Sequence, residues 1–332
     1  MTDTTCTRTA PRHRRTATPT DHRTTTTVAA LDIGGTKMAG AIIDSAGRRL
    51  ARAQRATPAD GSSAQLGAAL ADLVGELRAS SWWDDVTAVG IGSTGPVDTA
   101  GGTITPVNIP GWQAYPIADE VSRMAAGLPA RLAGDAIAMA QGEQWLGAAR
   151  GCANALCMVV STGVGGGLIL DHRVRTGDTG NAGHIGHISV DMNGERCVCG
   201  ARGCVETMAS GPAILRYALA HGWSPPADTA ATTQGVAEAA GRGDTVALAA
   251  FDRAGQALAA GIAATSHLAE LRLAVIGGGV AKAGPILFEP IRAHLADYAT
   301  LAFASSLQIR PALLEEDAGL VGAAAAAFEL HG

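Results

Sequence analysis

Short apolar runs that end in glycines recur along this chain. Four of them have the length and composition of buried strands, at residues 28–33, 86–91, 156–160 and 273–276. The first passes through Gly34 and Gly35 into a second apolar run at 38–44, which predicts two strands joined by a glycine turn. Residues 161–170 repeat this pattern of strand, glycine loop and strand. The repetition indicates a duplicated domain.

Apolar residues at helical spacing lie between the predicted strands. They predict a helix over residues 63–80 whose apolar face holds Leu66, Leu70, Leu73, Val74 and Leu77. Further helices are expected after Asp135, across 244–268 and from Asp317 onward. Strands that alternate with helices in this way predict an α/β protein of two similar lobes with a nucleotide in the cleft.

Length and charge narrow the class of protein. At 332 residues, with 47% apolar and 17% charged residues, the chain can bury a core large enough for two domains. A formal net charge of −5 gives no reason to expect binding to nucleic acid or to an anionic membrane. Even the alanine-rich run at 321–328 is too short for a membrane span. We therefore expect a soluble, cytoplasmic protein.

The first 27 residues differ in composition from the rest. They are rich in Thr, Arg and Pro and show no apolar period, so we expect a disordered tail at 1–27. An Arg-rich transit peptide is the alternative, although Asp3 and Asp21 argue against it. We place an N-terminal α/β lobe at 28–134 and a C-terminal α/β lobe at 135–332.

One imidazole and three thiols lie close together in the sequence, at His187, Cys197, Cys199 and Cys204. Structural zinc prefers four nitrogen or sulfur ligands, and the run C-x-C-G-x-x-G-C brings three thiols within reach of one ion. Zinc on one ring nitrogen of His187 would leave the other to make a hydrogen bond in a fixed direction. A group of reduced, buried cysteines is the alternative. We expect a zinc motif at 187–204 that shapes a neighbouring pocket.

Residues 90–95 read G-I-G-S-T-G and match the dinucleotide-binding pattern G-x-G-x-x-G. That pattern requires a helix directly after the glycines and an acid about twenty residues later. The residues that follow here, P-V-D-T-A-G-G-T-I-T-P, are helix breakers and β-formers. We therefore do not expect a dinucleotide site, and the lysine-bearing P-loop motif does not occur in the chain.

The glycine turns expose backbone amides that suit phosphate. In the first turn Gly34 and Gly35 leave amides uncovered, Thr36 adds a hydroxyl, and Asp32 stands where a hydrated Mg²⁺ ion fits. A plain turn is the alternative interpretation. Asp135 also has two interpretations, because a carboxylate at the start of a helix is often only a capping residue.

The order G-x-x-G-H followed by C-x-C-G-x-x-G-C-x-E, at residues 183–206, resembles the signature of the ROK sugar kinases. This family contains bacterial glucokinases, N-acetylmannosamine kinases and sugar-responsive repressors. The D-x-G-G-T hairpin at Asp32 is similar to the first phosphate loop of the actin-like ATPases, to which these kinases belong. The resemblance runs from about residue 28 to the C-terminus. It implies a ribonuclease H-like, actin-type fold, a homodimer, and ATP-dependent phosphorylation of a hexose 6-hydroxyl.

The resemblance also implies a role for individual residues. Asp135 is the catalytic base of the family motif. ATP and Mg²⁺ are held by Asp32, Gly34, Gly35, Thr36, Lys37, Thr162 and Gly163, and the adenosine is bordered by Gly277, Gly278 and Gly279. The sugar lies against Gly95, Asn108, Gly134, Asp135, His184, His187 and Glu206. The last helix packs back near the nucleotide.

Two positions depart from the family pattern. The family reads G-E-x-G-H where this chain has His184 in place of the glutamate, and the family's Asn-Asp has become Gly134-Asp135. By resemblance, both missing side chains bind the 3-hydroxyl of the sugar. We therefore hypothesise a glucose-like hexose altered at C3, with 3-amino-3-deoxyglucose (kanosamine) as the leading candidate. Ordinary glucose or N-acetylmannosamine, held by other contacts, is the alternative.

A sugar-responsive ROK repressor is the rival of another class. It needs a helix-turn-helix before the first phosphate hairpin, whereas 27 unpatterned residues precede the hairpin here. Asp32 and Asp135, which a kinase needs, are both present. We therefore expect a kinase that binds a small sugar and ATP.

Overall fold

The computed structural model describes residues 26–59, 61–227 and 229–331. The tail expected at 1–27 lies outside this range except for its last two residues. The chain divides into two compact units, which are described separately. Unit 1 comprises the chain up to Gly151, Thr176–Asn181 and the segment from Asp317; unit 2 comprises Cys152–Arg175 and Ala182–Glu316.

Unit 1 is built on a five-stranded mixed sheet. Its strands are β1 (Thr27–Ile33), β2 (Lys37–Asp44), β3 (Arg49–Ala56), β4 (Val86–Ser93) and β7 (Ala130–Gly134). The order is β3-β2-β1-β4-β7, with antiparallel pairing from β3 to β1 and parallel pairing from β1 to β7. Leu31 and Ile33 face one buried layer while Val28 and Ala30 face the other, because successive side chains of a strand point to opposite faces.

Unit 2 repeats this sheet with different strands. They are β8 (Ala155–Val160), β9 (Val164–Leu170), β10 (Arg173–Arg175), β11 (Leu273–Gly277) and β12 (Gln308–Pro311). The order β10-β9-β8-β11-β12 has the same pattern of antiparallel and parallel pairs as the sheet of unit 1. The two similar α/β lobes expected from the repeated glycine hairpins are therefore confirmed.

The helices of unit 1 cover both faces of its sheet. They are α1 (Ser63–Arg78), α2 (Ile117–Met124), α3 (Asp135–Trp145) and α9 (Ala318–Phe328), with short 3₁₀ turns at Trp83–Asp85 and Glu329–His331. The five apolar residues predicted for the first helix are the buried residues of α1. A capping box between Ser62 and Gln65 fixes where this helix begins.

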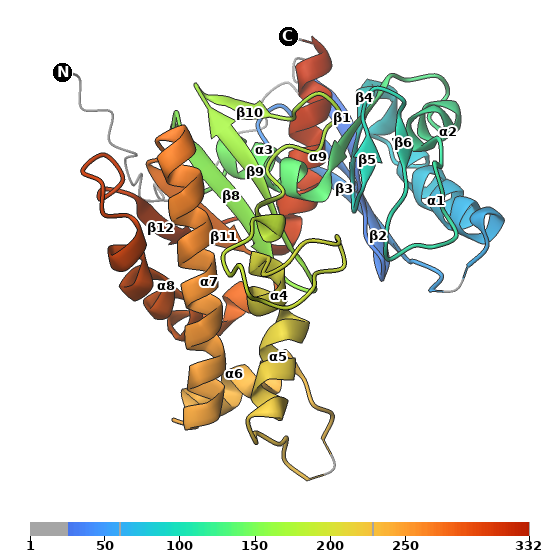
Figure 1. Ribbon diagram of the computed structural model, residues 1–332. Coiled ribbons are helices and arrows are strands. Elements are labelled where there is room, and N and C mark those ends of the chain that lie inside the picture. Colours follow the sequence, from blue (N-terminus) through green and yellow to red (C-terminus); the bar gives the residue numbers. More distant parts are fainter. Residues whose placement is uncertain (1–25, 60, 228, 332) are drawn as a thin grey trace, which may run out of the picture. The chain divides into compact units, whose positions relative to one another are not determined.

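The last helix, α9, approaches the sheet and α3 very closely. In Figure 1 it lies against β1 and β4. A Cβ on Gly90 of β4 would collide with the carbonyl of Ala323, and a Cβ on Gly322 would collide with the carbonyl of Ala138 on α3. Glycine at these two positions lets backbone approach backbone, so α9 belongs to the core of unit 1.

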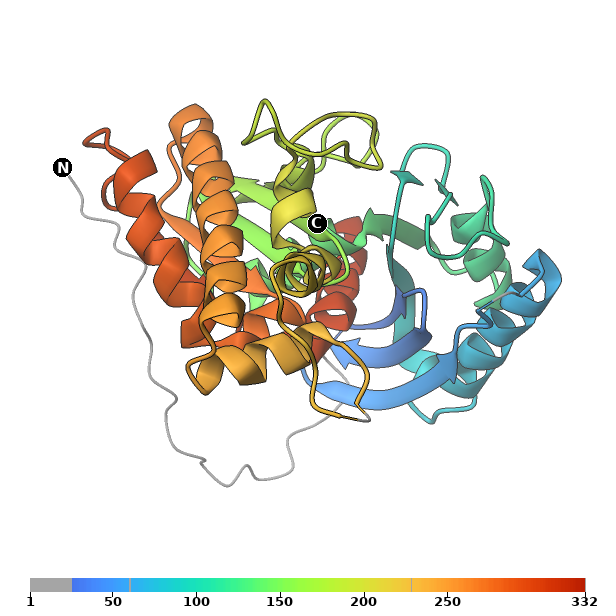
Figure 2. The same ribbon diagram turned by 60° about the horizontal axis from the view of Figure 1, so that its bottom comes forward.

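Unit 2 is largely helical outside its sheet. Its helices are α4 (Val205–Ala209), α5 (Gly211–Ala220), α6 (Thr233–Gly241), α7 (Thr245–Ala269) and α8 (Pro285–Tyr298), with 3₁₀ turns at Ile185–His187 and Val280–Ala283. Figures 1 and 2 both show α8 beside the long helix α7, which also contacts α5 and α6. Among the described residues, no helix is both long and apolar enough to cross a membrane.

Two expectations from the sequence meet different outcomes here. The segment after Gly95 forms the short paired strands β5 (Val97–Asp98) and β6 (Thr103–Ile104) instead of a helix, so the dinucleotide fingerprint is rightly excluded. The predicted lobe boundary at 134 differs from the observed division. Unit 1 extends to Gly151 and also includes the segment from Asp317, because α3 and α9 pack on each other and on the first sheet.

Candidate functional site

The turn between β1 and β2 carries the residues expected to hold phosphate. The Gly34 amide donates to the Lys37 carbonyl at 3.0 Å, and the Thr57 hydroxyl donates to the Gly34 carbonyl at 2.7 Å. Thr36 is exposed, and Gly34, Gly35 and Lys37 are half-buried. Within the described chain, the amides of Gly35 and Thr36 donate to no protein group. The turn is therefore held closed on one side while two amides remain for a ligand.

Asp32 lies next to this turn, on the face of the sheet that α9 covers. A Cβ on Gly319, in the first turn of α9, would stand 2.7 Å from the carboxylate carbon of Asp32. Burial raises the pKa of Asp32 to about 6, with the charge of Asp135 acting in the same direction and that of Lys37 in the opposite one. These three groups form one electrostatic cluster in unit 1.

Asp135 is the first residue of α3, directly after β7. Its side chain is exposed, and its Oδ1 accepts a hydrogen bond from the Ala136 amide at 2.7 Å. The residue at the N-cap is Gly134, which supplies no capping side chain. Asp135 thus takes part in the helix start and is also accessible, as a general base must be.

The fold does not require glycine at position 134. The backbone there has φ −65° and ψ 150°, which any residue adopts. A Cβ would meet Val97 Cγ2 at 3.8 Å and the Gly180 carbonyl at 3.9 Å, which are ordinary contacts. The Asn181 side chain holds this wall in place by donating to the Val97 carbonyl at 2.8 Å. Glycine therefore leaves open space beside Asp135 that a larger side chain could fill.

The expected sugar-side residues of unit 1 lie beside the glycine turn. The Thr94 hydroxyl donates to Asn108 Oδ1 at 3.0 Å, and a Cβ on Gly35 would stand 2.6 Å from Asn108 Nδ2. Gly95 follows Thr94, and its carbonyl accepts from the Val107 amide at 3.3 Å. The side chain of Asn108 is exposed. Gly95, Asn108 and the β1–β2 turn, where phosphate is expected, are thus brought together.

The turn between β8 and β9 is the counterpart in unit 2. The Ser161 amide donates to the Gly163 carbonyl at 2.9 Å, which leaves Thr162 exposed at the tip. Glu206, in the first turn of α4, accepts from the Val164 amide with Oε2 at 2.8 Å. The same oxygen would lie 2.7 Å from a Cβ on Gly163. Glycine at 163 therefore lets the Glu206 carboxylate pack directly against this turn.

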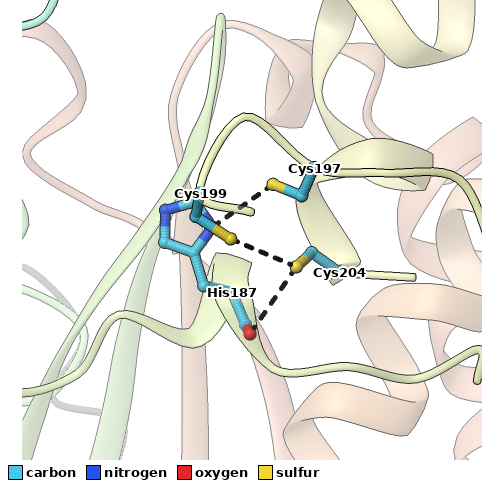
Figure 3. A group of neighbouring side chains, drawn as sticks. All are labelled: His187, Cys197, Cys199 and Cys204. Atoms are coloured by element: carbon cyan, nitrogen blue, oxygen red, sulfur yellow. Dashed lines mark hydrogen bonds between the residues drawn. The ribbon is translucent and has the colours of Figure 1, made fainter. Parts of the chain in front are cut away.

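His187, Cys197, Cys199 and Cys204 converge in unit 2, as Figure 3 shows. Their ligand atoms all lie within 4.8 Å of one another, and His187 Nδ1 is 3.7 Å from Cys197 Sγ. The loop needs Gly203 for this geometry, because φ is +60° there and a Cβ would collide with the Asp191 carbonyl. The predicted four-residue group is therefore assembled by the fold.

The donor set of this group fits tetrahedral zinc. Burial and the neighbouring thiols raise the pKa of Cys204 to about 12, so a thiolate at Cys204 needs a nearby cation to offset its charge. Because His187 presents Nδ1 to the thiols, its Nε2 points away from them (Figure 3). The exposed His184 ring lies nearly parallel to the His187 ring, with 6.0 Å between centroids and 13° between planes.

A cavity of about 870 Å³ lies in unit 2 next to the β8–β9 turn. Ser161 and Thr162 line it on one side, and Gly279 of the third glycine turn lines it on another. Gly277 ends β11, and Gly278 has φ +92° with no room for a Cβ against the Val160 carbonyl. The beginnings of α5 and α6 complete the wall. Helix N-termini and bare turns favour a ligand that carries phosphate.

Sequence reasoning missed most of this lining. The additional residues include Gly211, Pro212, Thr232, Thr233, Gln234 and Glu238. Two local signals mark helix starts here: Pro212 lies in the first turn of α5, and Thr232 caps α6 by accepting from the Gly235 amide at 3.0 Å. Such signals locate the helix starts, but their convergence on one cavity depends on the packing of both helices on α7.

Three known proteins are similar to this chain over most of its length. The glucokinase of Thermotoga maritima is 33% identical over 305 residues, which cover 89% of this chain and 95% of that protein. An N-acetylmannosamine kinase of Yersinia pseudotuberculosis is 37% identical over 299 residues, which cover 89% and 96%. The crystal structure of a ROK family glucokinase from Streptomyces griseus, in complex with glucose and AMPPNP, has a TM-score of 0.78 and 34% identity, and covers 91% and 99%.

The family comparison agrees with these relatives. The model of the ROK family matches residues 28–329, which include both sheets and the four-residue Cys and His group. The two repeated sheets are those of the actin-like ATPase type of α/β fold expected from the sequence. The chain therefore belongs to the ROK family.

Proposed function

We propose that this protein is an ATP-dependent sugar kinase that phosphorylates the 6-hydroxyl of a glucose-like hexose. The observation that carries the proposal is Asp135, an exposed carboxylate at the start of α3 in electrostatic contact with Asp32. The relatives named glucokinase and N-acetylmannosamine kinase support a sugar as the acceptor. The relative crystallised with glucose and AMPPNP supports the pairing of a hexose with an adenine nucleotide.

In the proposed reaction Asp135 orients the acceptor hydroxyl and accepts its proton as the hydroxyl oxygen attacks the γ-phosphate. Phosphoryl transfer depends mainly on positioning and charge neutralisation. The amides of Gly35 and Thr36, and those of Thr162 and Gly163, would cradle the phosphates of ATP. Mg²⁺, when bound, neutralises phosphate charge, and Asp32 would hold its water shell.

The remaining expected residues take supporting roles in this proposal. Gly277, Gly278 and Gly279 would border the adenosine, and the cavity that Gly279 lines supports this role. His187 and the three cysteines would hold a zinc ion that stabilises the 187–204 loop, and His187 would then present Nε2 toward the sugar. Glu206 and His184 complete the sugar side of unit 2.

The test of the kinase is a coupled assay of ADP release with purified protein. The panel is glucose, mannose, N-acetylmannosamine, glucosamine and 3-amino-3-deoxyglucose. We expect sugar-dependent ADP release, with phosphate on the 6-oxygen of the product by NMR. Sequence-specific binding in a DNA gel shift, without ADP release from any of the five sugars, would support the repressor and contradict the proposal.

The sugar itself is proposed from the two departures at Gly134 and His184. Neither the backbone angles at position 134 nor the neighbouring atoms require a glycine there. We therefore attribute Gly134 to the space that it leaves for the sugar. A site with unmatched polar groups discriminates strongly between substrates. We therefore propose a hexose altered at C3, with 3-amino-3-deoxyglucose first. An ammonium group favours a carboxylate over an imidazole, so the amine binds neutral or faces Asp135 or Glu206.

The test of this specificity compares kcat/KM for 3-amino-3-deoxyglucose and glucose in the wild type and in the double variant Gly134→Asn, His184→Glu. Both positions accept the change, because a Cβ at 134 meets only ordinary contacts and His184 is exposed. We expect the ratio to shift toward glucose by roughly 10-fold or more. If the wild type already prefers glucose and the ratio does not move, ordinary glucose is the substrate.

Two further expectations stay predictions. The homodimer is tested by light scattering of the eluting peak in size-exclusion chromatography, at two protein concentrations. The cytoplasmic location is tested by fractionating cells that express the full chain. Neither result affects the assignment of Asp135.

A further inference from the structure

Asn108 lies on a loop that is firmly anchored on one side of it. Ile109 and Trp112 are 1% and 0% exposed, and the Trp112 amide donates to the Ile109 carbonyl at 3.0 Å. Asn108 itself is exposed. Burial of Ile109 and Trp112 therefore holds the loop in place while the Asn108 amide stays exposed to solvent.

Two contacts decide which way this amide points. The Thr94 hydroxyl donates to Oδ1 at 3.0 Å, so the oxygen is engaged and Nδ2 is left as the donor. The other contact is with Gly35, where a Cβ would stand 2.6 Å from Nδ2 and 2.8 Å from Cγ of Asn108. Gly35 does not have a positive φ. The glycine is therefore needed for the space that Asn108 occupies, not for its backbone angles.

Thr94 joins the same two pieces through its backbone. Its amide donates to the Ile33 carbonyl at 3.1 Å, at the end of β1 just before the glycine turn. Thr94 therefore holds the end of β1 through its backbone amide and the Asn108 side chain through its hydroxyl. Neither Thr94 nor the Gly35 contact is needed to close the hairpin, which Gly34, Lys37 and Thr57 already close.

We propose that Thr94 and Gly35 are positioning residues for the sugar, which act by fixing the Asn108 amide as a donor, and that the phosphate turn thereby tunes sugar affinity even without ATP. This inference rests on the proposed function, in which Asn108 binds the hexose. It assigns to Gly35 a second role beyond leaving its own amide open to phosphate. It also makes sugar and nucleotide binding reciprocal, because both ligands act on one turn.

The first experiment compares two neighbouring glycines of the turn in the full chain. Gly35→Ala places a methyl group 2.6 Å from Asn108 Nδ2, which must move, whereas a Cβ on Gly34 stands 3.1 Å from the Lys37 carbonyl and does not reach Asn108. Sugar affinity is measured by calorimetry without nucleotide, using whichever of glucose and 3-amino-3-deoxyglucose the wild type phosphorylates better. We expect Gly35→Ala to weaken the sugar Kd about 10-fold, and Gly34→Ala to change it by less than about 2-fold.

The second experiment removes the hydrogen bond and keeps the shape. Thr94→Val has no hydroxyl to hold Asn108 Oδ1, and Thr94→Ser restores one. We expect Thr94→Val to raise the KM for sugar by roughly 3- to 10-fold with a smaller change in kcat, and Thr94→Ser to return KM to the wild-type range. Thr105→Val is the control, because Thr105 bonds the Ala114 amide in the same region without touching Asn108.

The third experiment shows whether Gly35 acts through Asn108. In an Asn108→Ala background there is no amide to displace, so adding Gly35→Ala should leave the sugar Kd unchanged. A further loss in the double variant, or equal effects of Gly34→Ala and Gly35→Ala, overturns the inference and leaves the kinase standing. A wild type that phosphorylates none of the five sugars overturns the proposed function and this inference together.

Discussion

Units 1 and 2 are two copies of one sheet that differ at matching positions. In unit 1, Asp32 of β1 pairs with Ala39 one place before the strand end at the turn. The matching place in unit 2 is Val159 of β8, which pairs with Gly165. One copy therefore has a carboxylate where the other has an apolar side chain, although the hydrogen-bonded frame is the same.

The comparison separates what the shared sheet and its glycine turn supply from what individual side chains supply. Both copies provide a glycine turn with uncovered amides at the end of the first strand. Unit 1 adds Asp32 near the end of β1 and Asp135 after β7, whereas unit 2 places the Glu206 carboxylate against its turn and adds a cavity beside Ser161 and Gly279. In the proposed function, the same sheet and turn support reacting groups in one copy and a bound ligand in the other, because function depends on the side chains that a fold carries.

The largest expected effect comes from Asp135, the proposed base. Asp135→Asn should cut turnover by roughly 10²–10⁴ while sugar and ATP binding stay nearly intact, because the variant keeps the shape but cannot accept a proton. Steady-state kinetics and calorimetry measure the two quantities. Asp119→Asn is the matched control, since Asp119 is also an exposed acid in the first turn of a helix. Near-normal turnover in Asp135→Asn would remove Asp135 as the base.

The next largest effect is expected from the 187–204 loop of unit 2, which holds the four Cys and His residues. Cys199→Ser should lose the bound metal and weaken sugar affinity by roughly 10- to 100-fold, because the metal orients His187. Metal analysis should find about one zinc per chain in the wild type and none in the variant. Cys157→Ala is the control, since this buried cysteine of β8 lies outside the group. An active wild type without zinc would contradict this prediction.

A third prediction tests how much the buried Asp32 carboxylate lowers the stability of the folded protein. Asp32 has a pKa of about 6 in the folded protein against 3.8 ordinarily, so the folded state binds more protons between pH about 4 and 6. The contribution of Asp32 to stability therefore falls as pH rises through this window. In Mg²⁺-free protein, Asp32→Asn should be more stable than the wild type above pH 6, by up to about 3 kcal/mol, and equal to it below pH 4. Urea unfolding at pH 4 and pH 7.5 measures this difference.

The smallest expected effect comes from giving unit 2 the missing carboxylate. Val159→Asp places a charge at a half-buried position with no second acid nearby among its strand partners, and should destabilise the protein by about 1–2 kcal/mol at pH 7.5. Val159→Thr is the control for shape. If Val159→Asp is as stable as Val159→Thr at pH 7.5, burial does not explain why the two copies differ.

The sequence predicts features whose cause is local. The four residues of the predicted zinc site, the buried face of α1 and the three glycine turns follow from spacing within a few residues, and the structure forms each of them. Packing between distant segments was predicted only through the resemblance, which implied that the last helix packs back near the nucleotide but did not give its contact with α3. The lobe boundary was placed at 134 because nothing near Asp135 indicates that α3 packs on a helix that begins at Ala318. The contact between Gly35 and Asn108 is hidden for the same reason.

The close fit of α9 also sets the order in which the chain can fold during synthesis. The ribosome makes all of unit 2 before it makes the segment from Asp317, so unit 2 has its full sequence first. Until then, α9 does not cover the apolar layer formed by Val28, Ala30 and Ala88. The half of the protein that is translated earliest is thus the half that matures last, and nascent chains stalled before Asp317 should expose that layer to chaperones.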